Sequence, residues 1–170
     1  DQAGGANGLI FDLRYNPGGL LISAVQISNL FVEQGTIVSA EDKNGKNTFP
    51  PQQASKHRAK LAGLPTVVLI NKGSASASEI VAGCLQAHGA AVIVGERSYG
   101  KGSVQTIHVT DRNAQMKLTT QYYRLPPNRR KGEVKGRLVH KRPNQKMWGV
   151  DPDILVKMTP KQIEDTYYLR

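Results

Sequence analysis

The sequence has few of the residues that mark disulfide-rich, metal-binding or membrane-spanning proteins. It contains one cysteine, Cys84, so no internal disulfide can form, and its place in an apolar helical pattern predicts a core residue. No apolar run approaches the ~20 residues that a bilayer-spanning helix needs. The histidines lie in no motif, and no His, Cys, Asp and Glu cluster has metal-ligand spacing. We therefore expect no metal, no cofactor and no histidine-based catalytic triad.

The charge is unevenly distributed along the 170 residues, a length that suits one domain. The formal net charge is +10, and the stretch from Arg124 to Lys146 holds nine basic residues and one acid. Few aromatics interleave with these charges, so we expect no nucleic-acid partner, although nucleic-acid binding is an alternative for this stretch. We predict that residues 128–147 form a basic insertion or loop that is solvated or lies near a membrane surface.

Short apolar runs separated by turn residues predict an α/β fold with a mostly parallel core. We expect the first crossover helix to begin at Leu20 and the second to end at Gly89, with residues 41–62 forming a loop or flap. The run 65–70 is typical of a strand covered on both faces. The expected strands are 9–13, 36–40, 65–70, 91–94, 104–109 and 116–123, the last two joined by a hairpin turn at 111–113, and a short helix closes the chain.

Residues 73–79, with three serines among small residues, follow the predicted central strand and open the second helix. Ligands bind beyond the carboxyl ends of strands in α/β sheets, and a helix N-terminus offers unpaired N–H groups there. Ser76 is our candidate nucleophile for acyl transfer, with the N–H of Ala77 as an oxyanion donor. The alternative is a helix cap, because Ser76 and Glu79 also match the capping-box pattern.

Lys101 is flanked by Gly100 and Gly102, which permit close packing around its side chain. A lysine acts as a base only when neutral, so this role requires shielding from water. Gln105 lies four residues further on, and in an extended segment both side chains share a face, where a neutral amide can orient the amine. A solvated turn or an anion-binding loop is the alternative reading.

The turn at residues 16–19 also joins a strand to a helix, and its paired glycines leave backbone N–H groups free to face a ligand. Either Gly18 or Gly19 is expected to form an oxyanion hole together with Ala77. A simple turn explains this segment alone equally well.

Residues 12–19, 73–79 and 95–105 together resemble the carboxyl-terminal (tail-specific) processing proteases, and residues 117–120 and 149–153 match later segments of that family. The resemblance implies a crotonase- and ClpP-like spiral fold and a serine peptidase acting near exposed, apolar C-termini through an acyl-enzyme. By position it assigns the nucleophile to Ser76, the general base to Lys101 and its orientation to Gln105. Ala77 and one of Gly18 and Gly19 correspond to the oxyanion hole.

The resemblance also implies that residues 1–170 are a peptidase core fragment. Family members carry a PDZ domain and an opening part of the peptidase domain that this sequence lacks, and they are extracytoplasmic, often periplasmic, bacterial proteins. Protein or peptide substrates with apolar tails are the expected partners. A non-catalytic binding module on the same scaffold, as in the retinoid-binding proteins of the eye that resemble this family, is the alternative.

Overall fold

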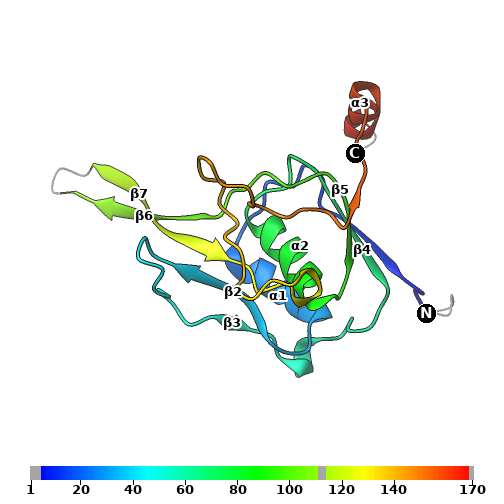
Figure 1. Ribbon diagram of the computed structural model, residues 1–170, viewed down its shortest axis with the longest axis horizontal. Coiled ribbons are helices and arrows are strands. Elements are labelled where there is room, and N and C mark those ends of the chain that lie inside the picture. Colours follow the sequence, from blue (N-terminus) through cyan, green and yellow to red (C-terminus); the bar gives the residue numbers. More distant parts are fainter. Residues whose placement is uncertain (1–4, 111–113, 169–170) are drawn as a thin grey trace.

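The computed structural model describes residues 5–110 and 114–168 of the chain. Two sheets pack around helix α2, helix α1 lies beside α2, and a long ribbon leaves the body on one side (Figure 1). In chain order the elements are β1 (Leu9–Asp12), α1 (Leu21–Phe31), β2 (Thr36–Glu41), β3 (Gln52–Gln53), the 3-10 helix η1 (Lys56–Arg58), β4 (Thr66–Ile70), α2 (Ala77–His88), β5 (Val92–Gly95), β6 (Ser103–Val109), β7 (Gln115–Arg124), the 3-10 helix η2 (Arg129–Lys131), β8 (Ile154–Leu155) and α3 (Pro160–Tyr168).

The first sheet has the strand order β1-β4-β5-β8, and all of its pairings are parallel. Short runs of Val, Ile and Leu form β4 and β5, and the helix α2 returns the chain between them, as the sequence predicts. Parallel strands end at one edge of their sheet. The loops that follow β1, β4 and β5 therefore gather at that edge, which is where ligands bind in such folds.

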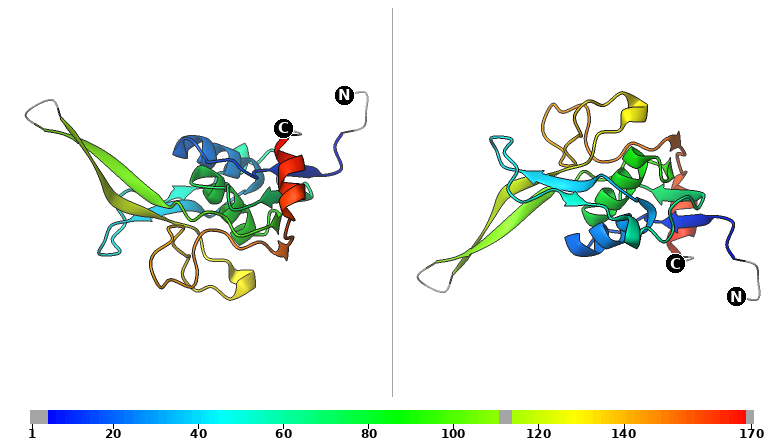
Figure 2. Two further views of the ribbon diagram at one scale, coloured as in Figure 1. Left: turned by 90° about the horizontal axis from the view of Figure 1, so that it is seen from above. Right: turned by 90° about the horizontal axis from the view of Figure 1, so that it is seen from below.

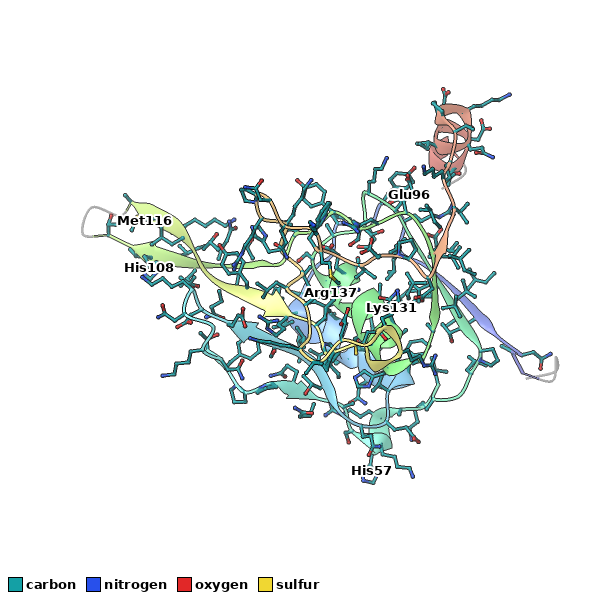
Figure 3. The ribbon with its side chains drawn as sticks, in the orientation of Figure 1. His57, Glu96, His108, Met116, Lys131 and Arg137 are labelled. Atoms are coloured by element: carbon teal, nitrogen blue, oxygen red, sulfur yellow. The ribbon has the colours of Figure 1, made fainter. Side chains whose placement is uncertain are left out.

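The second sheet is antiparallel, in the order β3-β2-β7-β6. Strands β6 and β7 form the predicted hairpin, with His108 paired to Met116, and extend away from the body (Figures 1 and 3). The register shifts between Val104 and Gln105. The predicted turn at 111–113 lies outside the described residues.

The core lies around α2, which contacts β2 of one sheet and β5 of the other. Ile80 and Leu85 of this helix pack among buried residues of both sheets, including Ile37 and Ile93. Cys84 is fully buried, and burial raises the pKa of its thiol to about 12. The full burial confirms its interpretation as a core residue, and the raised pKa keeps the thiol protonated near neutral pH.

Two expectations about local structure need correction. Residues 41–62 contain β3 and η1, because Gln52 and Gln53 pair with β2 across a bulge. Strand β4 is not covered equally on both faces: Val68 and Ile70 are buried, whereas Val67 and Leu69 are only half-buried. The alternation arises because α2 and the core cover one face, while the other face is partly open.

Two arginines of the basic stretch, one in β7 and one in the loop that follows, form buried ion pairs and do not point into solvent. Arg124 joins Glu41 of β2 at 2.6 Å with both side chains largely buried. Arg137 joins Glu133 at 3.0 Å and also donates to Gln86 of α2 at 2.9 Å. None of the described helices is both long and apolar enough to cross a membrane.

Candidate active site

Ser76 lies at the junction between β4 and α2 in a conformation that serine rarely adopts. Its φ and ψ are 58° and −117°, a region normally reserved for glycine, and its side chain is half-buried. Such a conformation costs about 1–3 kcal/mol and persists only where the surroundings enforce it. A serine on a strained strand-to-helix turn is the geometry that exposes the nucleophilic serine of α/β-hydrolases.

The surroundings that enforce this elbow come from the neighbouring loop after β1. The Asn71 side-chain oxygen accepts hydrogen bonds from the N–H groups of Tyr15 (2.9 Å) and Gly73 (3.0 Å). The buried Ser74 hydroxyl donates to the Leu13 carbonyl oxygen at 2.7 Å. The Ala75 N–H donates to the carbonyl oxygen of Asn16 at 3.0 Å. These contacts lock the serine elbow against the turn that holds the paired glycines.

Gly18 and Gly19 differ sharply in their surroundings. Gly18 has a φ of +94°, and a Cβ there would lie 2.6 Å from the Ala75 carbonyl oxygen and 2.7 Å from the Ala77 nitrogen. Its N–H is already engaged by the Asn16 side chain at 3.0 Å. Gly19 faces open space, and neither its N–H nor that of Ala77 is hydrogen-bonded to any residue of the described ranges. Two free donors thus come from segments in direct contact.

A small apolar cavity opens beside these donors. Its volume is about 250 Å³, and Gly18, Gly19 and Ala77 contribute to its wall. The rest of the wall is mostly apolar and comes from β1, α1 and α2, with Phe11, Leu20, Ala24, Ile27 and Val81. A cavity of this kind accepts an uncharged side chain next to the two N–H groups.

Glu79 joins the loop after β4 to the loop after β5. Its side chain is fully buried, and one carboxylate oxygen accepts from the N–H groups of Ser76 and Lys101, each at 2.8 Å. The other oxygen accepts from the Gly100 N–H at 2.7 Å and the Ser98 hydroxyl at 2.5 Å. Burial raises the pKa of Glu79, and these four donors oppose that rise. We call this residue, with its four donors, the Glu79 anchor.

The Lys101 loop is held by the basic stretch that follows β7. A Cβ on Gly100 would lie 2.6 Å from Trp148, and one on Gly102 would lie 2.6 Å from the side chain of Val139. The Lys141 N–H donates to the Gly100 carbonyl oxygen at 2.9 Å. The flanking glycines therefore permit close packing of the main chain against the segment 139–148, but this packing does not surround the Lys101 amine.

The side chain of Lys101 is exposed, and within residues 5–110 and 114–168 its amine forms no hydrogen bond or ion pair. The described residues alone do not form the expected shield around this amine. Gln105 is exposed as well, and it makes no hydrogen bond to Lys101. Lys101 precedes β6, and the register shift at Val104/Gln105 interrupts the alternation on which the shared face was predicted.

Histidines and metal ligands do not build an alternative site in the described part of the chain. His57 and His108 lie at distant points of the surface (Figure 3), and His88 contacts the Thr36 carbonyl oxygen at 2.8 Å. Burial lowers the pKa of His140, which packs against Tyr122. No group of three potential ligands that could hold a metal ion occurs among the residues described.

Comparison with known proteins shows the family to which this chain belongs. The profile of peptidase family S41 matches residues 2–156. The chain belongs to peptidase family S41. The carboxy-terminal-processing protease of Bartonella bacilliformis is 46% identical over 123 residues, covering 70% of this chain and 27% of that protein. The carboxy-terminal processing protease CtpA of Bacillus subtilis is 45% identical over 116 residues, covering 68% of this chain and 24% of that protein.

A solved structure of a photosystem II D1 C-terminal processing protease superposes on this S41 chain with a TM-score of 0.75. The two are 30% identical, and the match covers 94% of this chain and 37% of the other. The chain thus spans roughly a quarter of the length of the two curated relatives described above. The recognition of a carboxyl-terminal processing protease family is confirmed.

The structure adds site residues that the sequence motifs did not reveal. Asn71, Ser98 and Trp148 position the two loops, and Gly149 leaves room for the anchor, since a Cβ there would lie 2.6 Å from the Ser98 hydroxyl. The only sequence signal for the Glu79 anchor was the Ser76–Glu79 capping pattern, which accounts for one of its four hydrogen bonds. The other three depend on a loop about 20 residues further along.

Proposed function

We propose that this chain is the catalytic core of a serine-type peptidase that cuts proteins near exposed, largely apolar C-termini. The observation that carries the proposal is the strained Ser76 beside two unengaged N–H groups in an S41 chain. The relatives described above carry the names of C-terminal processing proteases. We further propose that the helices and parallel strands belong to a crotonase- and ClpP-like spiral core.

In the proposed reaction, the Ser76 oxygen attacks the scissile carbonyl carbon while the Lys101 amine accepts the hydroxyl proton. The oxyanion is held by the N–H groups of Ala77 and Gly19, because the Gly18 N–H is already engaged. The C–N bond then breaks, and Lys101 returns the proton to the leaving amine. Water hydrolyses the resulting ester, with Lys101 again moving the proton and Gln105 orienting the amine.

Because Lys101 is exposed in this chain, the mechanism requires that its amine be shielded from water during the reaction. We propose that a bound substrate backbone, together with segments present in longer relatives, excludes water from the amine and so favours its neutral form. An extracytoplasmic site in a bacterium and an associated PDZ domain belong to the same proposal. They rest on resemblance to relatives that are about four times as long as the matched segment.

A binding module without catalysis is the second candidate, and the exposure of Lys101 favours it. Covalent capture by a fluorophosphonate separates the two. We expect labelling of the native chain, loss of labelling in Ser76→Ala, and retention in Ser103→Ala, which removes a serine outside the elbow. Labelling that persists in Ser76→Ala would refute the nucleophile. A native chain that binds peptides but is never labelled would establish the binding module.

A further inference from the structure

The stretch after β7 forms its own side of the molecule, opposite helix α1 across α2 (Figure 2). Within this stretch, the Arg137 side chain donates to the Gly149 carbonyl oxygen at 3.0 Å. The Gly149 N–H in turn donates to the Val139 carbonyl oxygen at 2.9 Å. These hydrogen bonds hold the loop 132–137 against the segment 139–149, so the side chains that the two segments expose belong to one surface.

Six exposed side chains, four basic and two apolar, define what we call the 134–147 surface: Val134, Lys135, Lys141, Arg142, Lys146 and Met147. None of its four basic side chains forms an ion pair with a residue of the described ranges. The neighbouring carboxylates are already paired, namely Glu133 with Arg137, Asp151 with Arg97 and Asp153 with Lys131. The surface therefore carries an uncompensated positive charge, which favours an anionic partner.

Each half of the 134–147 surface also presents an apolar side chain to solvent. Val134 is 97% exposed and adjoins Lys135, and Met147 is 49% exposed and adjoins Lys146. A single exposed apolar residue is common on proteins, but here an alkyl side chain lies next to an unpaired ammonium group twice. Anionic membranes attract this combination, because apolar side chains enter the headgroup region while ammonium groups meet the lipid phosphates.

The aromatic rings beside this surface favour a lipid over a nucleic acid. Trp148 has the cationic groups of Arg97 and Lys141 at 4.2 and 4.8 Å from its ring centre. The Tyr122 ring has the Arg142 guanidinium at 4.3 Å. Bases of single-stranded nucleic acids stack on open aromatic faces, whereas these rings are engaged by cations of the chain itself. The groups that remain open are alkyl chains and ammonium groups, which match an anionic lipid.

We propose that the 134–147 surface docks on an anionic lipid membrane, with Val134 and Met147 entering the headgroup region. The inference concerns binding alone and does not depend on peptide cleavage. It places the membrane close to the lysine side of the candidate site, because the Lys141 N–H donates to the carbonyl oxygen of Gly100, the neighbour of Lys101. A chain held in this way meets proteins that lie at the membrane surface.

Co-sedimentation with vesicles tests this docking. The native chain is mixed with vesicles of phosphatidylcholine alone or of equal parts phosphatidylcholine and phosphatidylglycerol. We expect about 100-fold tighter binding to the anionic vesicles, and release of the chain at high salt. Lys135→Gln and Lys146→Gln should each weaken that binding about five-fold, and Val134→Ser should weaken it several-fold through lost apolar contact. Lys60→Gln is the matched control, because it removes the same charge from the turn after η1, beside α1, and should change nothing.

Equal binding to neutral and anionic vesicles, or binding to neither, would overturn the proposal. A loss in Lys60→Gln as large as that in Lys135→Gln would also overturn it, because adsorption would then follow the net charge of the whole chain. A short single-stranded DNA is titrated in parallel. If the chain stays off anionic vesicles and binds this DNA, with a loss in the lysine variants and none in Val134→Ser, the surface belongs to nucleic acid instead.

Discussion

The two halves of the candidate site are built differently. On the serine side, Ser76, Ala77 and the glycine turn are tied together by buried hydrogen bonds, and the strained backbone is held in place. On the lysine side, the main chain is anchored equally well by Glu79, but the Lys101 side chain extends into solvent. The proposed oxyanion donors are therefore preorganised in this chain, whereas the environment that the proposed base needs depends on what covers Lys101.

The largest loss of activity is expected from Lys101→Ala, which changes the lysine side of the site and leaves the serine side intact. Removal of a general base lowers turnover by about 10²–10⁴-fold. Because the side chain is exposed and unpaired, the melting temperature should stay within about 1–2 °C of the native value. Peptide turnover and thermal unfolding are measured together, with Lys135→Ala as the matched control. Native-like turnover in Lys101→Ala would refute the base role.

Glu79→Ala should damage both halves at once, because it removes the acceptor of four donors, of which two are buried and two are partly buried. Each buried donor left without a partner costs roughly 1–3 kcal/mol, so we expect a loss of several kcal/mol in the free energy of unfolding. Urea denaturation measures that loss. Glu79→Gln keeps the shape of the side chain, but its NH₂ group faces N–H and O–H donors and cannot accept from them. Its free energy of unfolding should lie between those of the native chain and Glu79→Ala. A free energy of unfolding in Glu79→Ala equal to that of the native chain would show that the two halves are held in place independently of Glu79.

Gly18→Ala and Gly19→Ala test the serine side with a matched pair. A Cβ at position 18 would meet backbone atoms that cannot move, at a φ of +94°, and should cost about 1–3 kcal/mol and much of the fluorophosphonate labelling. A Cβ at position 19 enters open space, so Gly19→Ala should retain the fold. Equal stability of the two variants would contradict the described turn.

The smallest effect is expected away from both halves, at the Glu41–Arg124 pair that joins β2 to β7. Its hydrogen bond to Arg124 lowers the pKa of Glu41 below the ordinary 4.5. The folded form then binds its proton less readily than the unfolded form. The pair's contribution is therefore present above pH 4.5 and is lost as the pH falls through the lowered pKa. Between neutral and acidic pH, the free energy of unfolding should fall by about 1 kcal/mol less in Glu41→Gln than in the native chain. An unchanged titration would contradict the assignment.

Local patterns were enough to predict most elements and the segments that form the site. Apolar periodicity predicted β4, α2 and β5, and small residues after a buried strand predicted the elbow at Ser76. The sequence did not distinguish Gly18 from Gly19, since the difference arises from contact with Ala75 and Ala77 about 60 residues away.

Contacts between segments far apart in the sequence also explain the other features that the sequence did not predict. The packing of the basic stretch against Gly100 was missed, because the local charges that predict a loop say nothing about its tertiary contacts. The short strand β3 forms only because β2 offers an edge. The exposure of Lys101 could not follow from its flanking glycines, which report on the backbone and not on what surrounds the amine.

A single carboxylate that receives the main chain of both Ser76 and Lys101 makes their alignment cooperative. If either loop swings away, the remaining loop loses part of the support that fixed it, so half-assembled arrangements are disfavoured.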